Sequence, residues 1–482
     1  MGRPNVLFIT LDQFRGDTMS CAGHPLVRTP NLDHLAANGV RLSRHYAQAA
    51  PCAPGRAALY TGTYQMNNRV VANGTPLDAR FDNVALAASR AGYDPVLLGY
   101  SDQGVDPRTV PAGDPRLSTY EGVLPGFAVE LDLTGQHLPW LSWLGELGHD
   151  VHDVRTMLET EHERPVEHSV STFLTDRLLA YIDRQDGPWF AHASYLRPHP
   201  PYRAAGAFAS LYDPDDCPDP LPIPAERHRL HDTMLGLRGV RAPRDRAAMR
   251  ALRAQYYGMV SEVDAQLGRV WAHLVATGAW DDTVVVVTAD HGEQLGDQGL
   301  MEKLGFFESS YHIVGIVRDP RQRGGMGTVV ESFTENVDLM PTLCEAIGID
   351  VPAQCDGLPL TPFLAGTTPP WWRDAAHYEW DWRDAWITAG PLPDPFDRRL
   401  ERHNLAVRRS RDRAYVQFGD GTAICFDLAA DPTWGTRVTD PAVVCAEAQA
   451  MLAWRAQHTD RTMTGMLLRD GGIGRVPAPA AI

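Results

Sequence analysis

The sequence lacks the patterns that would place it in a membrane, disulfide-rich or repeat class. It contains no apolar run near the roughly 20 residues that a membrane-spanning helix needs. Its 7 cysteines are scattered and form no Cys-x-x-Cys pair, so we expect neither a disulfide framework nor a structural zinc site. Internal repeats are also missing. The apolar stretch at residues 6–10 is too short for the core of a secretion signal, so we expect a cytoplasmic protein without membrane contact.

Positive charge is scarce as well. The chain has 44 Lys and Arg against 60 Asp and Glu, which gives a net charge of −16. Binding to nucleic acid needs a surplus of Lys and Arg to neutralise phosphates, so the sequence argues against a general nucleic-acid binder. A small anionic substrate is still compatible with it, because one pocket can be positive inside an acidic protein.

The first three quarters of the chain predict an α/β fold. The continuous apolar runs at 6–10 and 283–288 are typical of parallel strands buried on both faces. Segments with helical periodicity or helix-end signals alternate with such runs, at residues 31–37, 83–90, 166–185, 244–277 and 336–347. We therefore predict a large, mostly parallel sheet sandwiched by helices. Residues 102–165 and 197–244 are rich in Pro, Gly and Asp, and we expect long loops that wall a pocket.

The character of the sequence changes after residue 355. Residues 402–428 alternate like antiparallel strands, and residues 441–457 predict a helix. We predict a larger α/β domain at 1–355 and a smaller α+β region with an antiparallel sheet at 356–482, whose tail resembles an arm toward a neighbouring subunit. The tryptophan-rich segment 371–386 is either a pocket wall or a subunit interface.

Two pairs of polar residues follow predicted strands. Asp12 and Gln13 follow the first strand, and Asp290 and His291 follow the strand at 283–288. Because ligands of open α/β sheets gather at the carboxyl ends of strands, we expect these side chains to meet. Their oxygens and imidazole suit a divalent metal ion, with the imidazole moving the choice from Ca²⁺ toward Mn²⁺. The alternative is that the two aspartates only cap the turns or helices that follow.

The most specific motif lies at residues 51–62 and reads Pro-Cys-Ala-Pro-Gly-Arg-Ala-Ala-Leu-Tyr-Thr-Gly. Cys-x-Pro-x-Arg followed by Leu-x-Thr-Gly resembles the signature of the sulfatase family, part of the alkaline phosphatase superfamily. The Asp-His-Gly-Glu sequence at 290–293 and Lys303 beyond it fit the same family, over roughly residues 4 to 350. The resemblance implies that a maturation enzyme oxidises Cys52 to formylglycine, an aldehyde.

The resemblance is strongest to the phosphonate monoester hydrolase and phosphodiesterase branch of that family. Gln13, Gly55 and His291 stand where many sulfatases carry Asp, Ser and Asn. The resemblance also implies one divalent metal ion, Mn²⁺ or Ca²⁺, at Asp12, Gln13, Asp290, His291 and the modified Cys52.

The resemblance implies a nucleophile made from the hydrated aldehyde at residue 52. One hydroxyl loses its proton beside the cation and attacks sulfur or phosphorus, and the second hydroxyl lets the covalent intermediate collapse. Arg56 is expected to hold the diol oxygens. Lys303 is expected to neutralise a non-bridging oxygen, and His199 to protonate the leaving oxygen or bind the transferred group.

Three further residues are expected around the substrate. Asn73 and Tyr100 would donate hydrogen bonds to its remaining oxygens. Asp102 stands where the branch often has Thr, and an anion near an anionic substrate is unfavourable unless it has a role. It is either the base that breaks down the intermediate, a contact for a cationic substrate group, or a side chain that points away.

We therefore expect a metal-dependent hydrolase of small anionic esters. Sulfate monoesters, phosphonate monoesters and phosphodiesters are all monoanions in which a tetrahedral centre loses an alcohol or phenol, so we expect promiscuity among them. The alternatives are a two-zinc phosphodiesterase or phosphatase of the same superfamily, which Cys52 disfavours, and an inactive metal-binding homologue. The resemblance further implies a homo-oligomer, a tetramer or a dimer, and a formylglycine-generating maturation enzyme as partner.

Overall fold

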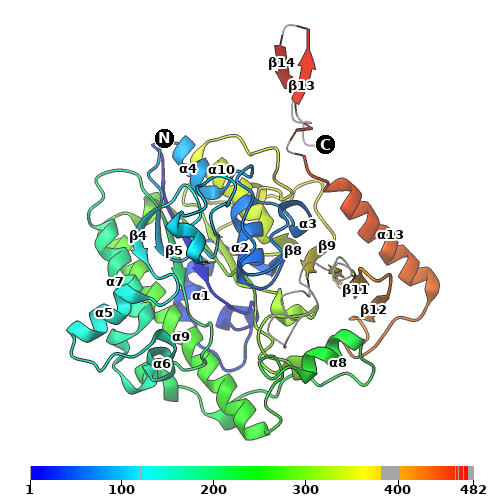
Figure 1. Ribbon diagram of the computed structural model, residues 1–482, viewed down its shortest axis with the longest axis horizontal. Helices are drawn as coiled ribbons and strands as arrows, with labels where there is room; N and C mark the ends of the chain where they lie inside the picture. Colours follow the sequence, from blue (N-terminus) through cyan, green and yellow to red (C-terminus); the bar gives the residue numbers. More distant parts are fainter. Residues whose placement is uncertain are drawn as a thin grey trace.

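A computed structural model describes residues 2–119, 121–381, 402, 404–461, 463–464, 466–470 and 472–475 of the chain. Eight strands form one large sheet in the order β4-β3-β5-β1-β6-β7-β2-β8 (Figure 1). These strands are β1 (Asn5–Leu11), β2 (Val40–Tyr46), β3 (Val96–Gly99), β4 (Ala128–Asp132), β5 (Phe190–Tyr195), β6 (Thr283–Thr288), β7 (Gly315–Arg318) and β8 (Thr328–Glu335). Only β7 runs antiparallel to its neighbours in this sheet, so the predicted mostly parallel sheet is confirmed.

Helices cover both faces of the sheet. Along β1 the side chains alternate between two hydrophobic cores, with Leu7 and Ile9 in one and Val6 and Phe8 in the other. The helices of the first core are α1 (Pro30–Ala37), α7 (Val170–Ile182) and α9 (Arg246–Ala276). The helices of the second core are α2 (Cys52–Thr61), α4 (Val84–Arg90) and α10 (Leu339–Ile347). Because both faces are covered, the central strands are apolar throughout, as the sequence predicts.

The three central strands end together. Thr10 of β1 pairs with Ser194 of β5 on one side and with Thr288 of β6 on the other, and all three strands are parallel. The residues that follow them therefore leave the sheet at one edge. This edge carries the polar pairs that the sequence predicts to meet.

A second, antiparallel sheet of four strands lies in the C-terminal part. Its strands are β9 (Ala375–Trp380), β10 (Leu405–Ser410), β11 (Arg413–Phe418) and β12 (Ala423–Asp427), in the order β12-β11-β10-β9. Helix α13 (Pro441–Gln457) packs on it through Met451 and Trp454. The predicted antiparallel strands and the predicted helix are confirmed. Trp382 and Trp386 of the tryptophan-rich segment lie outside the described residues.

A two-stranded hairpin, β13 (Met466–Arg469) and β14 (Gly472–Arg475), follows α13. Figure 1 shows it standing away from the rest of the molecule. The end of the predicted tail, residues 476–482, lies outside the described residues.

The two segments predicted as long loops contain short elements. β4, α5 (Leu138–Glu146), α6 (Val154–Glu159) and α8 (Arg229–Gly236) lie within them. The prediction was wrong there because helices of two or three turns give too few apolar repeats to show a period. Two further short α-helices in the described part of the chain are α3 (Gln65–Asn68) and α11 (Thr361–Leu364). Within the described part of the chain, no helix combines the length and apolar character needed to cross a bilayer.

Candidate active site

Helix α2 delivers Cys52 to the carboxyl edge of the sheet. Cys52 is its first residue, and every residue of the helix is buried. Pro54 lies in the first turn, where a missing N–H costs no hydrogen bond, and Gly62 ends the helix at a φ of 67°. Gly55 lies so close to β6 that a Cβ there would be 2.4 Å from the carbonyl oxygen of Asp290. Glycine at position 55 therefore lets the start of α2 rest directly on the end of β6.

Four residues of metal-ligating types meet beside this helix start. One ligand atom from each of Asp12, Cys52, Asp290 and His291 lies within 4.8 Å of the others, and all four residues are buried. His291 Nδ1 donates to the carbonyl of Gly292 at 3.0 Å, because a carbonyl only accepts. In the neutral ring Nε2 therefore carries a lone pair, and it lies 3.2 Å from Cys52 Sγ and 3.9 Å from Asp12 Oδ1.

The electrostatics of this cluster fit a cation. Asp12 Oδ1 is buried and has no hydrogen-bond partner among the described residues, although it faces the His291 lone pair. Burial acts to raise the pKa of Asp12, but nearby His199, Arg56 and His291 outweigh it and hold that pKa well below its usual range. Ionised oxygens and a lone pair that face one another are stabilised by a metal ion. The residues present therefore fit the divalent ion that the sequence predicts.

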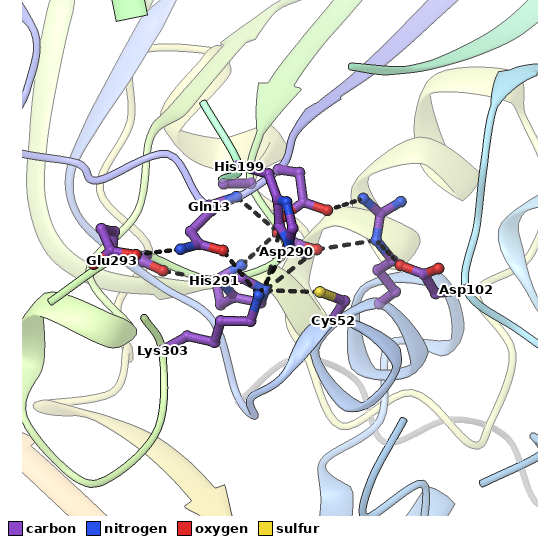
Figure 2. A network of polar contacts seen from close by, with 12 residues as sticks. Gln13, Cys52, Asp102, His199, Asp290, His291, Glu293 and Lys303 are labelled. Carbon is purple, nitrogen blue, oxygen red and sulfur yellow. Dashed lines mark hydrogen bonds and ion pairs between the residues drawn. The ribbon is translucent and has the colours of Figure 1, made fainter. Parts of the chain in front are cut away.

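Gln13 stands at the side of this cluster. Its backbone N–H donates to Asp290 Oδ1 at 3.2 Å, and its side-chain Oε1 accepts from Lys303 Nζ at 2.8 Å. Its amide nitrogen donates to Glu293. Figure 2 shows Gln13 between Glu293 on one side and the Cys52 cluster on the other.

Arg56 lies beneath the cluster and is fully buried. Its guanidinium donates to Asp290 Oδ2 at 3.0 Å, Asp12 Oδ2 at 3.1 Å and Ser194 Oγ at 2.8 Å. It also donates to the carbonyl of Tyr100 at 3.0 Å. In this arrangement Arg56 orients the two aspartates and balances part of their charge.

Tyr100 and Asp102 form the side of the site next to Arg56. The Tyr100 hydroxyl donates to Asp12 Oδ2 at 2.7 Å, so in this structure its proton is directed at the cluster. Asp102 has a left-handed φ of 51°, and its Oδ2 lies 3.3 Å from Arg56 Nε. Burial raises the pKa of Asp102 to about 7 against the effect of Arg56, with Asp12 adding to the rise. The Asp102 carboxylate therefore faces the buried guanidinium of Arg56 and does not point away from the site.

His199 and Lys303 face the cluster from two loops. Lys303 Nζ lies 3.2 Å from His199 Nε2, and His199 Nδ1 lies 2.8 Å from the carbonyl of Pro200. Because a carbonyl only accepts, Nδ1 donates there, and Nε2 accepts from Lys303. Burial and the charge of Lys303 lower the pKa of His199. In this pair Lys303 is therefore protonated, and His199 Nε2 carries the lone pair that accepts its hydrogen bond.

The thiol of Cys52 is poorly suited to act as a nucleophile. Burial raises its pKa well above the usual value, and the charges of Asp12 and Asp290 raise it further. A cysteine nucleophile needs the thiolate form. The unmodified side chain is therefore expected to be inert at neutral pH.

A pocket of about 400 Å³ opens above these residues. Cys52, Asn73, His199 and Lys303 are among the polar residues that line it. Its apolar wall is formed by Leu133, Val154, Leu158, Leu196, Pro200 and Pro201. Asn73 Oδ1 accepts from the backbone N–H of Ala53 at 3.0 Å, so Asn73 also caps the start of α2.

The structure thus brings together every residue predicted for the site. Sequence reasoning assigned no role to Glu293, Glu302 and Tyr202, which surround Gln13 and Lys303 with hydrogen bonds. The only signal for them was position, since Glu293 ends the Asp-His-Gly-Glu motif and Glu302 precedes Lys303. Nothing in their local sequence indicates that these acidic side chains point inward.

Comparison with known proteins defines the class. A family model described as Sulfatase matches residues 4–349. The chain is 37% identical to the multifunctional alkaline phosphatase superfamily protein PehA of Trinickia caryophylli, over 96% of this chain and 97% of the relative. It is 26% identical to an arylsulfatase of Clostridium perfringens, over 78% and 81% of the two chains. The chain therefore belongs to the sulfatase family, and it is a hydrolase of sulfuric or phosphoric esters.

Solved structures agree with the branch that the sequence resembles. The phosphonate monoester hydrolase of Agrobacterium radiobacter is 40% identical, with a TM-score of 0.91 over 99% of this chain and 100% of that one. The phosphonate monoester hydrolase SpPMH of Silicibacter pomeroyi is 33% identical, with a TM-score of 0.88 over 98% and 99%. Family membership implies a metal ion and a formylglycine made from the signature cysteine.

Proposed function

We propose that this protein hydrolyses sulfate monoesters, phosphonate monoesters and phosphodiesters with one formylglycine-dependent site. The observation that carries the proposal is the buried cluster of Asp12, Cys52, Asp290 and His291, of which Asp12 and Cys52 line the pocket. The similarity to PehA and to two phosphonate monoester hydrolases supports this range of substrates.

Asp12, Gln13, Asp290 and His291 would hold the metal ion, together with the modified residue 52. The single imidazole among oxygen ligands favours Mn²⁺ over Ca²⁺. When bound, the ion supplies positive charge that favours loss of a proton from the hydrated aldehyde. Arg56 keeps both aspartates in place below it.

Lys303 and His199 would act on the substrate side. Lys303 neutralises a non-bridging oxygen, and the Lys303–His199 pair supplies the proton that the leaving oxygen needs. Asn73 positions the start of α2 and faces the substrate from the pocket wall.

The charges of the site favour monoanionic substrates. Arg56 is engaged by the two nearest carboxylates, Asp12 and Asp290. The cations that line the pocket are the buried Lys303 and the more exposed Arg155. Asp102 and Glu121 also line the pocket and oppose additional negative charge on the substrate. We therefore expect sulfate monoesters, phosphonate monoesters and phosphodiesters to react faster than dianionic phosphate monoesters. The apolar wall suits an aryl or alkyl substituent.

The test compares kcat/KM for an aryl sulfate, an aryl phosphonate monoester, a phosphodiester and an aryl phosphate monoester on the matured protein. We expect activity on the three monoanions and loss of it in Cys52→Ala. Maturation is checked by intact mass, since residue 52 loses one sulfur and two hydrogens and gains one oxygen. Undiminished activity of Cys52→Ala would overturn the mechanism, and two zinc ions per chain would favour the two-zinc alternative.

We also propose that the chain assembles as a homo-oligomer, a dimer or tetramer. The hairpin of β13 and β14 stands away from the molecule in Figure 1, which suits an arm that contacts a second copy. Light scattering on the full chain and on a chain ending at residue 460 tests this. A monomeric full chain contradicts it. The cytoplasmic location stays a prediction from the sequence.

A further inference from the structure

Glu293 is a fully buried carboxylate whose two oxygens accept hydrogen bonds from four different groups. Oε1 accepts from the backbone N–H of Leu295 at 2.7 Å and of Glu302 at 2.8 Å. Oε2 accepts from the Tyr202 hydroxyl at 2.8 Å and from the side-chain nitrogen of Gln13. The four donors come from the end of β1, from the loop of His199 and from both sides of the turn that leads to Lys303.

These contacts decide which way the Gln13 amide points. Its nitrogen faces Glu293 Oε2 and lies 3.4 Å from Glu302 Oε2, and both are acceptors. Its oxygen faces Lys303 Nζ, which only donates, at 2.8 Å. Reversing the amide would place nitrogen against ammonium and oxygen against carboxylate. The oxygen, which is the only atom of this amide that can bind a metal ion, is thereby kept on the side of Lys303.

We propose that Glu293 is a positioning residue that presents the Gln13 oxygen to the metal ion and joins the loops of His199 and Lys303. Tyr202 lies three residues after His199, and Glu302 directly precedes Lys303, so one carboxylate connects three parts of the site. The proposal rests on the proposed function, because it requires that Gln13 serves the ion.

A carboxylate is required at position 293 because all four partners approach as donors. An amide there offers only one oxygen, and in Glu293→Gln this oxygen is expected to face the rigid backbone N–H groups of Leu295 and Glu302. The new amide nitrogen then faces Gln13, whose amide must reverse to avoid two opposed donors. Reversal turns the Gln13 nitrogen toward Lys303 and removes its oxygen from the metal ion.

The first test measures Mn²⁺ affinity of the metal-free full chain by calorimetry and electron paramagnetic resonance. We expect Glu293→Gln to weaken binding about 10- to 100-fold, as is typical when the partner of a metal ligand is lost. Gln13→Ala should weaken it by a similar factor, and combining both changes should add little, because Glu293 acts through Gln13. Tyr202→Phe is the matched control, since it removes a donor to the same Oε2 and a 3.5 Å contact of the Gln13 nitrogen but keeps the carboxylate that orients the Gln13 amide.

The second test exchanges the two groups in Gln13→Glu/Glu293→Gln. The amide at 293 then donates to the carboxylate at 13, whose oxygens face both Lys303 and the ion. We expect this double variant to bind Mn²⁺ more tightly than Glu293→Gln alone, which also keeps the proposal testable if that single variant does not fold. Wild-type affinity in Glu293→Gln, additive losses, or no rescue by the exchange would each overturn the proposal. Failure of the wild-type chain to bind any divalent ion would instead overturn the proposed function.

Discussion

His291 Nε2 lies 3.2 Å from the Sγ of Cys52, although the two residues are 239 positions apart in the sequence. His291 Nδ1 donates a hydrogen bond to the carbonyl of Gly292, so Nε2 is the acceptor in the neutral ring. Burial lowers the pKa of His291. A lone pair therefore points at the residue that the family converts to an aldehyde. The relationship places a potential metal ligand beside the cysteine whose modification family membership implies.

Removal of the metal ion is expected to destabilise the protein. A ligand that binds only the folded state adds about 2.7 kcal/mol of stability at 100 times its dissociation constant. We expect the melting temperature to fall when a chelator is added and to recover with Mn²⁺, as followed by calorimetry. In Asp12→Asn, which loses the charge of the unpartnered Oδ1, the melting temperature should respond little to either treatment. A full metal response in that variant would contradict the assigned ligand set.

Asp102 is expected to make stability depend on pH. Its pKa is about 7 in the folded chain, whereas an aspartate in an unfolded chain titrates near about 4. Between these values the folded state holds a proton that the unfolded state has released, so the free energy of unfolding falls as pH rises through this window and levels off above 7.

Asp102→Asn removes this contribution and leaves the other buried acids unchanged. Urea unfolding of both proteins at several pH values should show a smaller decline in the variant between pH 4 and 7. Burial also raises the pKa of Glu293 to about 7, but Glu293 is present in both proteins. The difference between the two curves therefore isolates the contribution of Asp102. Parallel curves would show that Asp102 titrates normally.

Gly55 is expected to tolerate no side chain. A Cβ at this position would lie 2.4 Å from the carbonyl oxygen of Asp290, so Gly55→Ala must push the start of α2 away from β6. We expect a loss of stability of about 1–3 kcal/mol and a large fall in kcat, because Cys52 moves with the helix. Gly236→Ala is the control, since a Cβ there meets nothing within 4 Å. Equal behaviour of the two variants would show that α2 has room to adjust.

The role of His199 is expected to depend on the leaving group. If the Lys303–His199 pair supplies the proton, His199→Ala should slow esters of alcohols by about 10²- to 10⁴-fold. Esters of nitrophenols, whose anions leave without a proton, should lose much less. The measurement is kcat/KM across phenols of graded pKa, with Mn²⁺ affinity as the check that the ion is still bound. Equal losses for all leaving groups would favour binding of the transferred group instead.

Much of the site could be predicted from the sequence because its parts carry local signals. Apolar runs at 6–10 and 283–288 predict buried parallel strands, and the parallel arrangement places the residues after them at one edge. Cys-x-Pro-x-Arg at 52–56, taken together with Leu-x-Thr-Gly at 59–62 and Asp-His-Gly-Glu at 290–293, is specific enough to indicate the family. The short helices of the pocket wall and the inward direction of Glu293 could not be predicted, since their periods are too short or their residue types usually lie at the surface.

The α/β class could be read from the sequence. The metal-ligand roles of Asp12, Asp290 and His291 and the modification of Cys52 are predictions made from it. The folded structure was needed to show that Asp12 and Asp290 bind Arg56, that Asp102 faces Arg56, and that the Gln13 amide donates to Glu293. The reason is physical. Gln13 and Glu293 are 280 residues apart, and a buried hydrogen bond between them exists only after β1 and β6 have paired and closed the site around both side chains.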